Sequence, residues 1–253
     1  MKMELHTSIQ ADGAQTALSL DGVFYGIEGR KILRGLSIEV EAARIGIVGR
    51  NGSGKSTLAR ALAGLIAPDS GTLKINGHDL AKDRKTALSE VGILFQNPDH
   101  QIIFPTVDEE ISFGLRQQGL SKDDADQRCR NTLSQFGKSH WAGMPVTALS
   151  QGQKHLLCLM AVAAMGPRMI ILDEPFTGLD IPTRMQLRRY LNRYAGGIAH
   201  VSHQPEDLIG CEIVIWLEKG SVEATGAADK VLRAFSDHMH HLGELDDLSD
   251  LSV

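Results

Sequence analysis

Apolar and polar residues alternate near the N-terminal end of the chain, after a mixed polar stretch at residues 1–17. Between residues 17 and 41 an apolar residue recurs at about every second position, the pattern of strands with one buried face. We expect two or three antiparallel strands in this region. A similar pattern over residues 72–80 predicts another strand that runs into a turn at Asn76-Gly77.

Short runs of mostly apolar residues indicate buried strands of a different kind. Four such runs lie at residues 45–48, 91–95, 169–173 and 197–203, and they are typical of parallel strands that are covered on both faces. A helix is expected at residues 182–194, between the last two runs. The remaining expectations are a hairpin over 211–226 turning at Lys219-Gly220, a closing helix over 227–235, and an acidic, flexible tail over 236–253.

Residues 97–165 differ from the rest of the chain because signs of helix caps replace the strand patterns. Thr106 and Ser150 are each followed three residues later by Glu or Gln, which is the spacing of a capping box. Ser121 is suited to begin another helix between them. The last helix contains the richest apolar run, residues 156–165. We expect this whole segment to form a helical subdomain inserted into the sheet.

The most specific motif is the segment RIGIVGRNGSGKST at residues 44–57. It matches the P-loop pattern G-x-x-x-x-G-K-[S/T], and it lies between an apolar strand and a helix, as that pattern requires. The backbone amides of such a loop and the helix N-terminus that follows form a concave site for phosphate groups. Lys55 adds a charge for the β- and γ-phosphates, and the Ser56 hydroxyl is a ligand for Mg²⁺. The nucleotide-binding residues expected here are Asn51, Gly52, Ser53, Gly54, Lys55, Ser56 and Thr57.

A second motif ends one of the buried strands. Residues 169–172 are apolar and lead directly to Asp173 and Glu174. Because ligands of parallel sheets bind at the carboxyl ends of the strands, Asp173 can hold Mg²⁺ beside the P-loop. Glu174 can then act as a general base that polarises the attacking water. The alternative is that both are ordinary surface carboxylates.

Together with four further motifs, these segments resemble the ATP-binding cassette family of transport ATPases over residues 18–235. LSQGQ at residues 149–153 is similar to that family's signature LSGGQ and precedes the paired carboxylates. Gln96, the Gly-Leu-Asp segment ending at Asp180, and His203 occur where the family has its Q-loop, D-loop and switch histidine. The resemblance implies an α/β fold, with a P-loop NTPase (RecA-like) core, an antiparallel β subdomain and the inserted α-helical subdomain.

The resemblance also implies roles in catalysis. His203 and Gln96 act with Glu174, His203 by contacting the γ-phosphate and orienting the water. Gln96 joins Mg²⁺, which is held by Ser56 and Asp173, to the helical subdomain. The implied ligands are ATP and Mg²⁺.

A further implication is a second ATPase subunit, either another copy of the chain or a paralogue. Ser150, Gly152 and Gln153 open a helix whose amides face the ATP of that subunit, so that two cassettes close head to tail around two nucleotides. Asp180 meets the partner across the same interface. Gln151 departs from the family's usual glycine, and the strength of closure is what this departure affects.

Two sets of residues allow two interpretations. Tyr25 is found where the family stacks an aromatic ring on adenine, and we favour that role over the alternative of a core aromatic, although stacking does not separate ATP from GTP. His238, His240 and His241 have the appearance of a metal cluster, although a solvated polar end of the chain is the alternative that we favour.

Composition narrows the class of protein. The chain has 253 residues and a net charge of −5, which provides no general attraction to nucleic acid. No apolar stretch reaches the roughly 18–20 residues of a membrane span, and the N-terminus lacks signal-peptide features. The three cysteines lie far apart, as expected for reduced thiols. We therefore expect a cytoplasmic protein that is peripheral on the inner face of the cell membrane through its partners.

The segment at residues 95–115 indicates the kind of transporter. It resembles the energy-coupling factor importers of vitamins and transition-metal ions, in which a transmembrane coupling subunit joins a small membrane-embedded substrate-binding subunit. Asp99 and residues 108–110 form either an acidic surface for an arginine of the coupling subunit or an acidic helix N-terminus. LSQGQ and the residues before it most resemble the ATPase of biotin importers. The alternatives are cobalt or nickel uptake, an importer that depends on a separate solute receptor, and a non-transport cassette.

Overall fold

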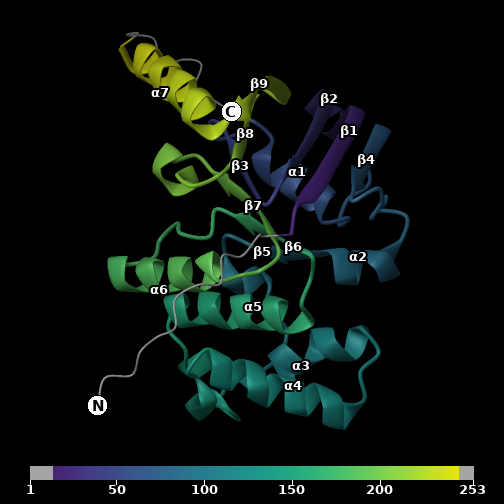
Figure 1. Cartoon of the computed structure of the whole chain (residues 1–253), viewed down its shortest axis with the longest axis vertical. Coiled ribbons are helices and arrows are strands. Elements are labelled where there is room, and N and C mark those ends of the chain that lie inside the picture. The colour runs from purple at the N-terminus through teal and green to yellow at the C-terminus, as the bar shows by residue number, and fades with distance from the viewer. Residues whose placement is uncertain (1–13, 245–253) are drawn as a thin grey trace.

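The computed structural model describes residues 14–244, which form two β-sheets and the helices that pack against them (Figure 1). Strands β1 (Thr16–Ile27) and β2 (Arg30–Ala42) form a long antiparallel hairpin, and β4 (Ser70–Ile75) pairs with the other edge of β1. Glu28 and Gly29 make the hairpin turn with φ of 50° and 81°, as two-residue turns between twisted strands require. The antiparallel strands predicted from the alternating pattern are confirmed.

The second sheet has six strands in the order β5-β6-β7-β3-β8-β9. All neighbours are parallel except β9, which closes one edge antiparallel to β8. The four apolar runs are confirmed as β3, β5, β6 and β7, and the predicted hairpin as β8 and β9. The strands are β3 (Arg44–Val48), β5 (Val91–Leu94), β6 (Met169–Asp173), β7 (Gly197–Ser202), β8 (Ile213–Glu218) and β9 (Ser221–Ala227).

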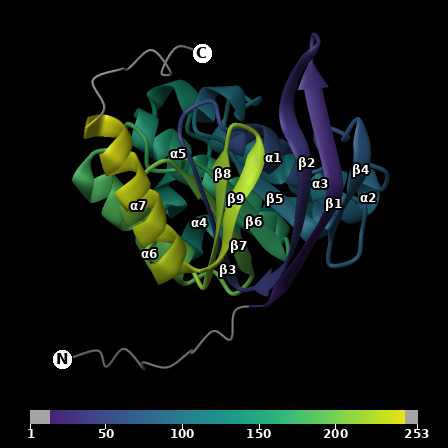
Figure 2. The ribbon, with the colours of Figure 1, turned by 90° about the horizontal axis from the view of Figure 1, so that it is seen from above.

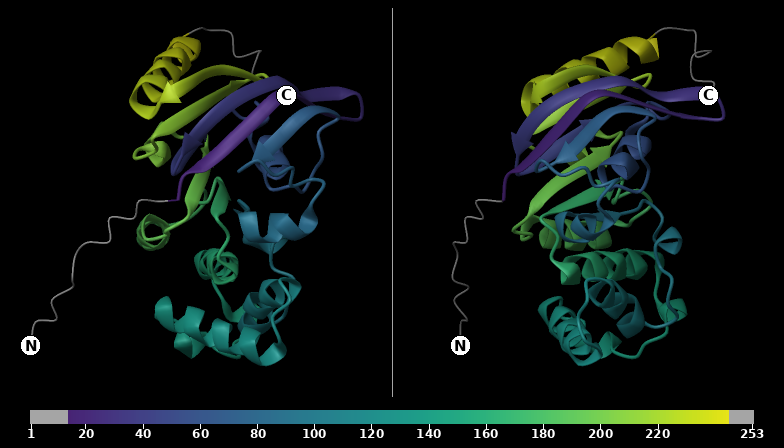
Figure 3. Two further views of the ribbon diagram at one scale, coloured as in Figure 1. Left: turned by 45° about the vertical axis from the view of Figure 1, so that its right-hand side comes forward. Right: turned by 90° about the vertical axis from the view of Figure 1, so that its right-hand side faces the viewer.

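The central strands are buried on both faces because alternate side chains enter different cores. Met169 and Ile171 of β6 pack in the core that contains helix α1 (Lys55–Leu62) and the antiparallel sheet. Ile170 and Leu172 pack on the other face, with helices α5 (Gln151–Met165) and α6 (Ile181–Asn192). Figure 3 shows these layers in two views.

Helices α3 (Val107–Gln117) and α4 (Lys122–Gln135) form the end of the molecule farthest from the antiparallel sheet, and α5 lies between them and the six-stranded sheet (Figure 1). Thr106, Ser121 and Ser150 are their N-cap residues, and each side chain accepts a hydrogen bond from a backbone N–H in the first turn. The predicted helix starts are therefore confirmed. Short 3₁₀ turns η1 (Pro98–His100), η2 (Ser139–Trp141) and η3 (Val146–Ala148) connect these elements.

Two local predictions need correction. The closing helix does not end at residue 235: α7 (Ala228–Glu244) continues through residues that we had assigned to a flexible tail. Its apolar face packs Phe235 and His238 against the ring of Trp216, which accounts for the extra length. The other correction is helix α2 (Arg84–Glu90), capped by Asp83, which was not anticipated. The rest of the proposed tail, residues 245–253, lies outside the described residues.

Helix α7 and the β1–β2 hairpin lie on opposite sides of β8 and β9 (Figure 2). None of the helices between residues 14 and 244 is long and apolar enough to cross a membrane. Within the same residues, no cluster of three or more His, Cys, Asp or Glu side chains is arranged to hold a metal ion, so the three histidines of α7 do not form one.

Candidate functional site

The six-stranded sheet brings four of the predicted motifs to one edge. The P-loop follows β3, Gln96 follows β5, Asp173 and Glu174 end β6, and His203 follows β7. Because these strands are parallel neighbours, their carboxyl ends lie side by side. A cavity of about 520 Å³ opens at this edge and is lined by Ile32, Asn51, Gly52, Gly54, Lys55, Ser56, Thr57, Gln96, Glu174, Thr177 and His203.

The glycines of the P-loop are needed for its shape. Gly52 and Gly54 have φ of 79° and 99°, a region that residues with a Cβ rarely adopt. Gly49 has an ordinary φ, but a Cβ there would lie 2.3 Å from the carbonyl oxygen of Leu217. The loop can therefore pass close to β8 and turn its amides into the cavity.

Lys55 is a buried cation at the base of this cavity. Its side chain is only 5% exposed, and Nζ donates hydrogen bonds of 2.9 Å to the carbonyl oxygens of Gly49 and Arg50. Burial lowers the pKa of Lys55, and the nearby carboxylates of Glu174 and Asp173 oppose that shift. Among residues 14–244 no carboxylate lies within ion-pair distance of Nζ. The buried hydroxyl of Ser53 also has no partner within the described chain. The phosphate oxygens of a bound triphosphate could pair with the Lys55 ammonium and accept a hydrogen bond from the Ser53 hydroxyl, so the two groups fit such a ligand.

The side-chain oxygens of Ser56, which lines the cavity, and of the neighbouring Asp173 lie side by side. The Ser56 hydroxyl donates a hydrogen bond of 2.9 Å to Oδ1 of Asp173, whose side chain is almost fully buried. Burial raises the pKa of Asp173, and the charge of Glu174 adds to the shift. A hydroxyl beside a carboxylate is the hard-oxygen donor set that Mg²⁺ prefers. The residues present therefore fit this ion.

We expect Asp173→Asn to raise the stability of the nucleotide-free protein while abolishing hydrolysis. An amide can still accept the Ser56 hydrogen bond but carries no buried charge, so a gain of about 0.5–2 kcal/mol in the free energy of unfolding is expected at neutral pH. Because the pKa of Asp173 is raised on folding, the gain shrinks as the pH falls through it and the wild-type carboxyl becomes neutral. Chemical denaturation at neutral and acidic pH measures this, and a gain that did not change with pH would contradict it.

Glu174 lies between the two other predicted catalytic residues. It has φ of 49°, an uncommon conformation for a residue with a side chain, and this directs its carboxylate into the cavity beside the P-loop. Oε2 accepts long hydrogen bonds from Gln96 Nε2 at 3.4 Å and from Thr177 Oγ1 at 3.3 Å. Oε1 lies 3.1 Å from Nδ1 of His203, close enough for an ion pair if the imidazole is protonated, although the two do not form a hydrogen bond. The ends of β5, β6 and β7 thus bring the side chains of Gln96, Glu174 and His203 together.

A buried carboxylate that the sequence did not predict supports the histidine loop. Asp207 lies in the 3₁₀ turn η4 (Pro205–Leu208) after His203, and it pairs with Arg184 of α6. Its other oxygen accepts a hydrogen bond of 3.1 Å from the Ser202 hydroxyl, which in turn accepts one from the backbone N–H of Gln204. Ser202 and Gln204, the neighbours of His203 in the chain, are therefore connected through Asp207 to helix α6.

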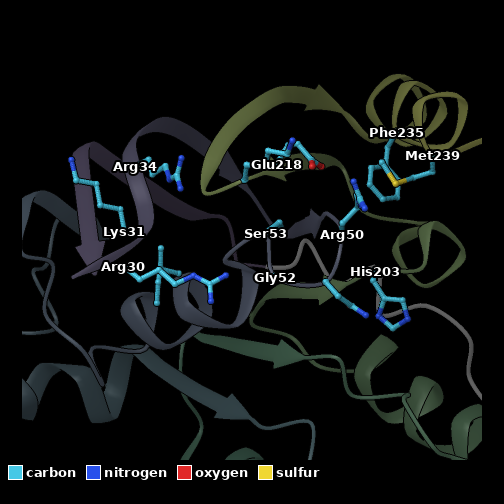
Figure 4. Close-up of a pocket in the computed structure, with 13 residues that line it drawn as sticks. Arg30, Lys31, Arg34, Arg50, Gly52, Ser53, His203, Glu218, Phe235 and Met239 are labelled. Carbon is cyan, nitrogen blue, oxygen red and sulfur yellow. The ribbon is translucent and has the colours of Figure 1, made fainter. Parts of the chain in front are cut away.

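A larger cleft of about 830 Å³ adjoins the P-loop cavity and shares four of its lining residues (Figure 4). Basic side chains dominate it, and Phe235 and Met239 of α7 close one end (Figure 4). The positive side chains are Arg30, Lys31, Arg34, Arg50 and Lys219, accompanied by the single carboxylate of Glu218. Such a concentration of positive charge attracts a triphosphate toward the P-loop.

Tyr25 lines neither of these two cavities. It is partly buried against the core beneath the antiparallel sheet, and its role in stacking on adenine stays a prediction. Ile32 on β2 lines both cavities instead, together with Thr177 and Arg50, each of which lines one. None of these three had been proposed, because neighbouring hairpin and loop residues cannot be ranked from sequence alone.

Ser150, Gly152, Gln153 and Asp180 are absent from the lining of the P-loop cavity within the described chain. Ser150 and Gln153 form the predicted capping box, and Asp180 caps α6 by accepting a hydrogen bond of 2.9 Å from the Thr183 backbone N–H. Gly152 allows the two helix starts to approach, since a Cβ there would lie 2.6 Å from the Thr183 methyl group. The residues predicted to bind nucleotide thus lie at two separate places on one chain, the P-loop cavity and the starts of α5 and α6.

The acidic residues at the start of α3 are engaged within the molecule. Asp108 accepts a hydrogen bond of 2.6 Å from the backbone N–H of Gly143, and Glu109 accepts one of 2.7 Å from the Thr106 hydroxyl. Glu110 is almost fully buried and accepts two backbone N–H groups of the preceding loop. These contacts favour the interpretation of residues 108–110 as a stabilised helix N-terminus.

Comparison with known proteins agrees with this geometry. The family model for ABC transporters matches residues 33–177. A biotin transport ATP-binding protein, BioM of Rhodobacter capsulatus, is 44% identical over 85% of this chain and 92% of its own length. An energy-coupling factor transporter ATP-binding protein, EcfA1 of Fusobacterium nucleatum, is 32% identical over 85% of this chain and 83% of its own. The structure of cbiO1 from Clostridium perfringens, part of the complex cbiONQ, has a TM-score of 0.72 and 28% identity, covering 90% of this chain and 98% of that one.

Proposed function

This chain belongs to the ABC transporter family and is an ATP-hydrolysing subunit of that family, and we propose that it powers a biotin importer of the energy-coupling factor type. The observation that carries the proposal is the 44% identity to a biotin transport ATP-binding protein over nearly the full length of both chains. The likeness to an energy-coupling factor ATPase supports the transporter type.

In the proposed reaction the residues at the strand ends act on ATP held by the P-loop. Lys55 and the loop amides bind the phosphates, and Ser56 and Asp173 would hold Mg²⁺, which would neutralise phosphate charge. Glu174 accepts a proton from the attacking water. His203 contacts the γ-phosphate, and Gln96 links the cluster to the helical end of the molecule.

A second copy or a paralogue completes each site in this proposal. The amides at the start of α5, with Ser150, Gly152 and Gln153, form an anion site that is separate from the cavity of the same chain. In a head-to-tail pair this helix start meets the triphosphate of the partner subunit, and Asp180 lies at the same interface. Closure then moves a transmembrane subunit at the inner face of the membrane.

The helical end of the molecule also has a surface suited to a membrane partner. Ile103 is 71% exposed and Phe113 is 38% exposed, so two large apolar side chains face solvent at this end. The ring of Phe113 packs on Phe104, with centroids 4.9 Å apart, and Phe104 directly follows Ile103 in the chain; Ile103, Phe104 and Phe113 are called the apolar patch here. We propose that the transmembrane coupling subunit contacts this patch.

Reconstitution tests the proposal. The chain is co-purified in detergent with the membrane subunits encoded beside it and placed in liposomes loaded with ATP on the side of the ATPase. We expect ATP-dependent movement of labelled biotin, and none when Glu174→Gln replaces the wild-type chain. Transport of cobalt or nickel instead would overturn the substrate, and dependence on a separate soluble receptor would overturn the transporter type.

A further inference from the structure

One face of helix α5 is fastened to the segment that carries Gln96. Gln151, Lys154 and His155 lie on this face, since residues three and four apart on a helix are neighbours. The Gln151 amide donates to Oδ1 of Asn97 at 3.5 Å, and Lys154 Nζ pairs with Oδ1 of Asp99 at 2.7 Å. The third contact joins His155 to the backbone of Gln96. These three contacts of α5 with residues 96–99 are called the α5 latch below.

His155 makes the most buried contact of the latch. Its side chain is 2% exposed, and Nε2 lies 2.9 Å from the backbone carbonyl oxygen of Gln96. A carbonyl oxygen only accepts hydrogen bonds, so Nε2 carries the hydrogen and donates it. Nδ1 is buried and has no partner in the described chain, and burial lowers the pKa of His155. The ring is therefore a neutral donor with one defined tautomer at physiological pH.

The latch lies between two parts of the proposed machinery. Gln96 reaches forward with its side chain to Glu174 in the cavity of its own chain. Ser150 begins the same helix, about 7.5 Å along the axis from His155 at 1.5 Å per residue. Because this stretch of helix is short, a displacement of the helix start is transmitted through His155 to the backbone of Gln96.

We propose that the α5 latch couples the two nucleotide sites of the head-to-tail pair, with His155 as a positioning residue for Gln96. The inference rests on the proposed function, because Ser150 meets a partner's triphosphate only in that pair. Binding of the partner's nucleotide at the start of α5 sets the position of Gln96, and thus of its hydrogen bond to Glu174. Gln151, at the position where the signature pattern has glycine, contributes a side chain to this coupling.

The test compares two substitutions in the full chain. His155→Leu fills the space but removes the donor, whereas His155→Gln keeps an N–H group that can reach the same carbonyl. For His155→Leu we expect kcat to fall about two- to tenfold, the range for one lost hydrogen bond, with ATP affinity of the isolated chain unchanged and the Hill coefficient for ATP falling toward one. His155→Gln should recover at least half of both losses. Leu157→Val, a buried change on another face of α5, controls for general loosening.

A surface pair keeps the inference testable if His155→Leu does not fold. Lys154→Gln should lower the Hill coefficient in the same direction, while Lys82→Gln, which removes a lysine from an exposed pair with Asp79, should leave it unchanged. If wild type is cooperative but neither His155→Leu nor Lys154→Gln alters cooperativity, the latch is wrong and the proposed function stands. A wild-type chain that hydrolyses ATP without cooperativity, and whose Glu174→Gln form does not pair in ATP, would overturn both.

Discussion

Glu174→Gln should bind ATP normally, lose nearly all hydrolysis and accumulate as a nucleotide-bound pair. Glutamine has the same shape and still accepts the hydrogen bonds of Thr177 and Gln96, but it cannot take a proton from water. A general base contributes about 10²–10⁴-fold to a rate, so kcat should fall by that amount. Phosphate release measures the loss, and light scattering during gel filtration in ATP measures the pair.

Glu206→Gln is a matched control for this experiment. Glu206 is an exposed carboxylate in the turn η4 close to the histidine loop, and it should be replaceable without effect. If Glu174→Gln retained hydrolysis within about threefold of wild type, Glu174 would not be the base. If it lost hydrolysis but stayed monomeric in ATP at high concentration, the head-to-tail closure would be wrong instead.

Lys55→Ala should act on nucleotide binding itself and nearly abolish it. The substitution removes the one lysine or arginine that lines the P-loop cavity within the described chain, since Arg50 lines only the adjoining cleft. Loss of charge-assisted hydrogen bonds worth about 3 kcal/mol predicts an affinity for ATP reduced by about 100-fold. Titration calorimetry with ATP measures the change.

Lys82→Ala provides the comparison, because its side chain is 82% exposed and paired only with Asp79. It should bind ATP as wild type does. An affinity of Lys55→Ala within about fivefold of this control would mean that the loop amides and the dipole of α1 hold the phosphates unaided.

The positions of the motifs were predictable from sequence wherever spacing along the chain determines geometry. The P-loop pattern, the carboxylates that end β6 and the caps at Thr106, Ser121 and Ser150 all depend on residues a few positions apart. The convergence of Gln96, Glu174 and His203 also followed, because parallel strands with apolar runs present their ends at one edge.

Predictions that depended on tertiary partners were less successful. The sequence left the carboxylates at 108–110 open between an acidic surface and an acidic helix N-terminus, and only partners such as the Gly143 amide, 35 residues from Asp108, favour the second. The length of α7 could have been found, since Val231, Phe235 and Met239 repeat at helical spacing. Asp207 had no local pattern at all, because its arginine comes from another helix.

The position of β3 in the middle of the sheet has a consequence for biosynthesis. Its neighbours are β7 and β8, which come from residues 197–202 and 213–218. At a translation rate of about 5–20 residues per second, the P-loop strand waits roughly 10–30 s for both neighbours to leave the ribosome. Until then the apolar strand β3 remains unpaired on the nascent chain. We therefore expect chaperones to bind this segment during synthesis, before the P-loop can bind ATP.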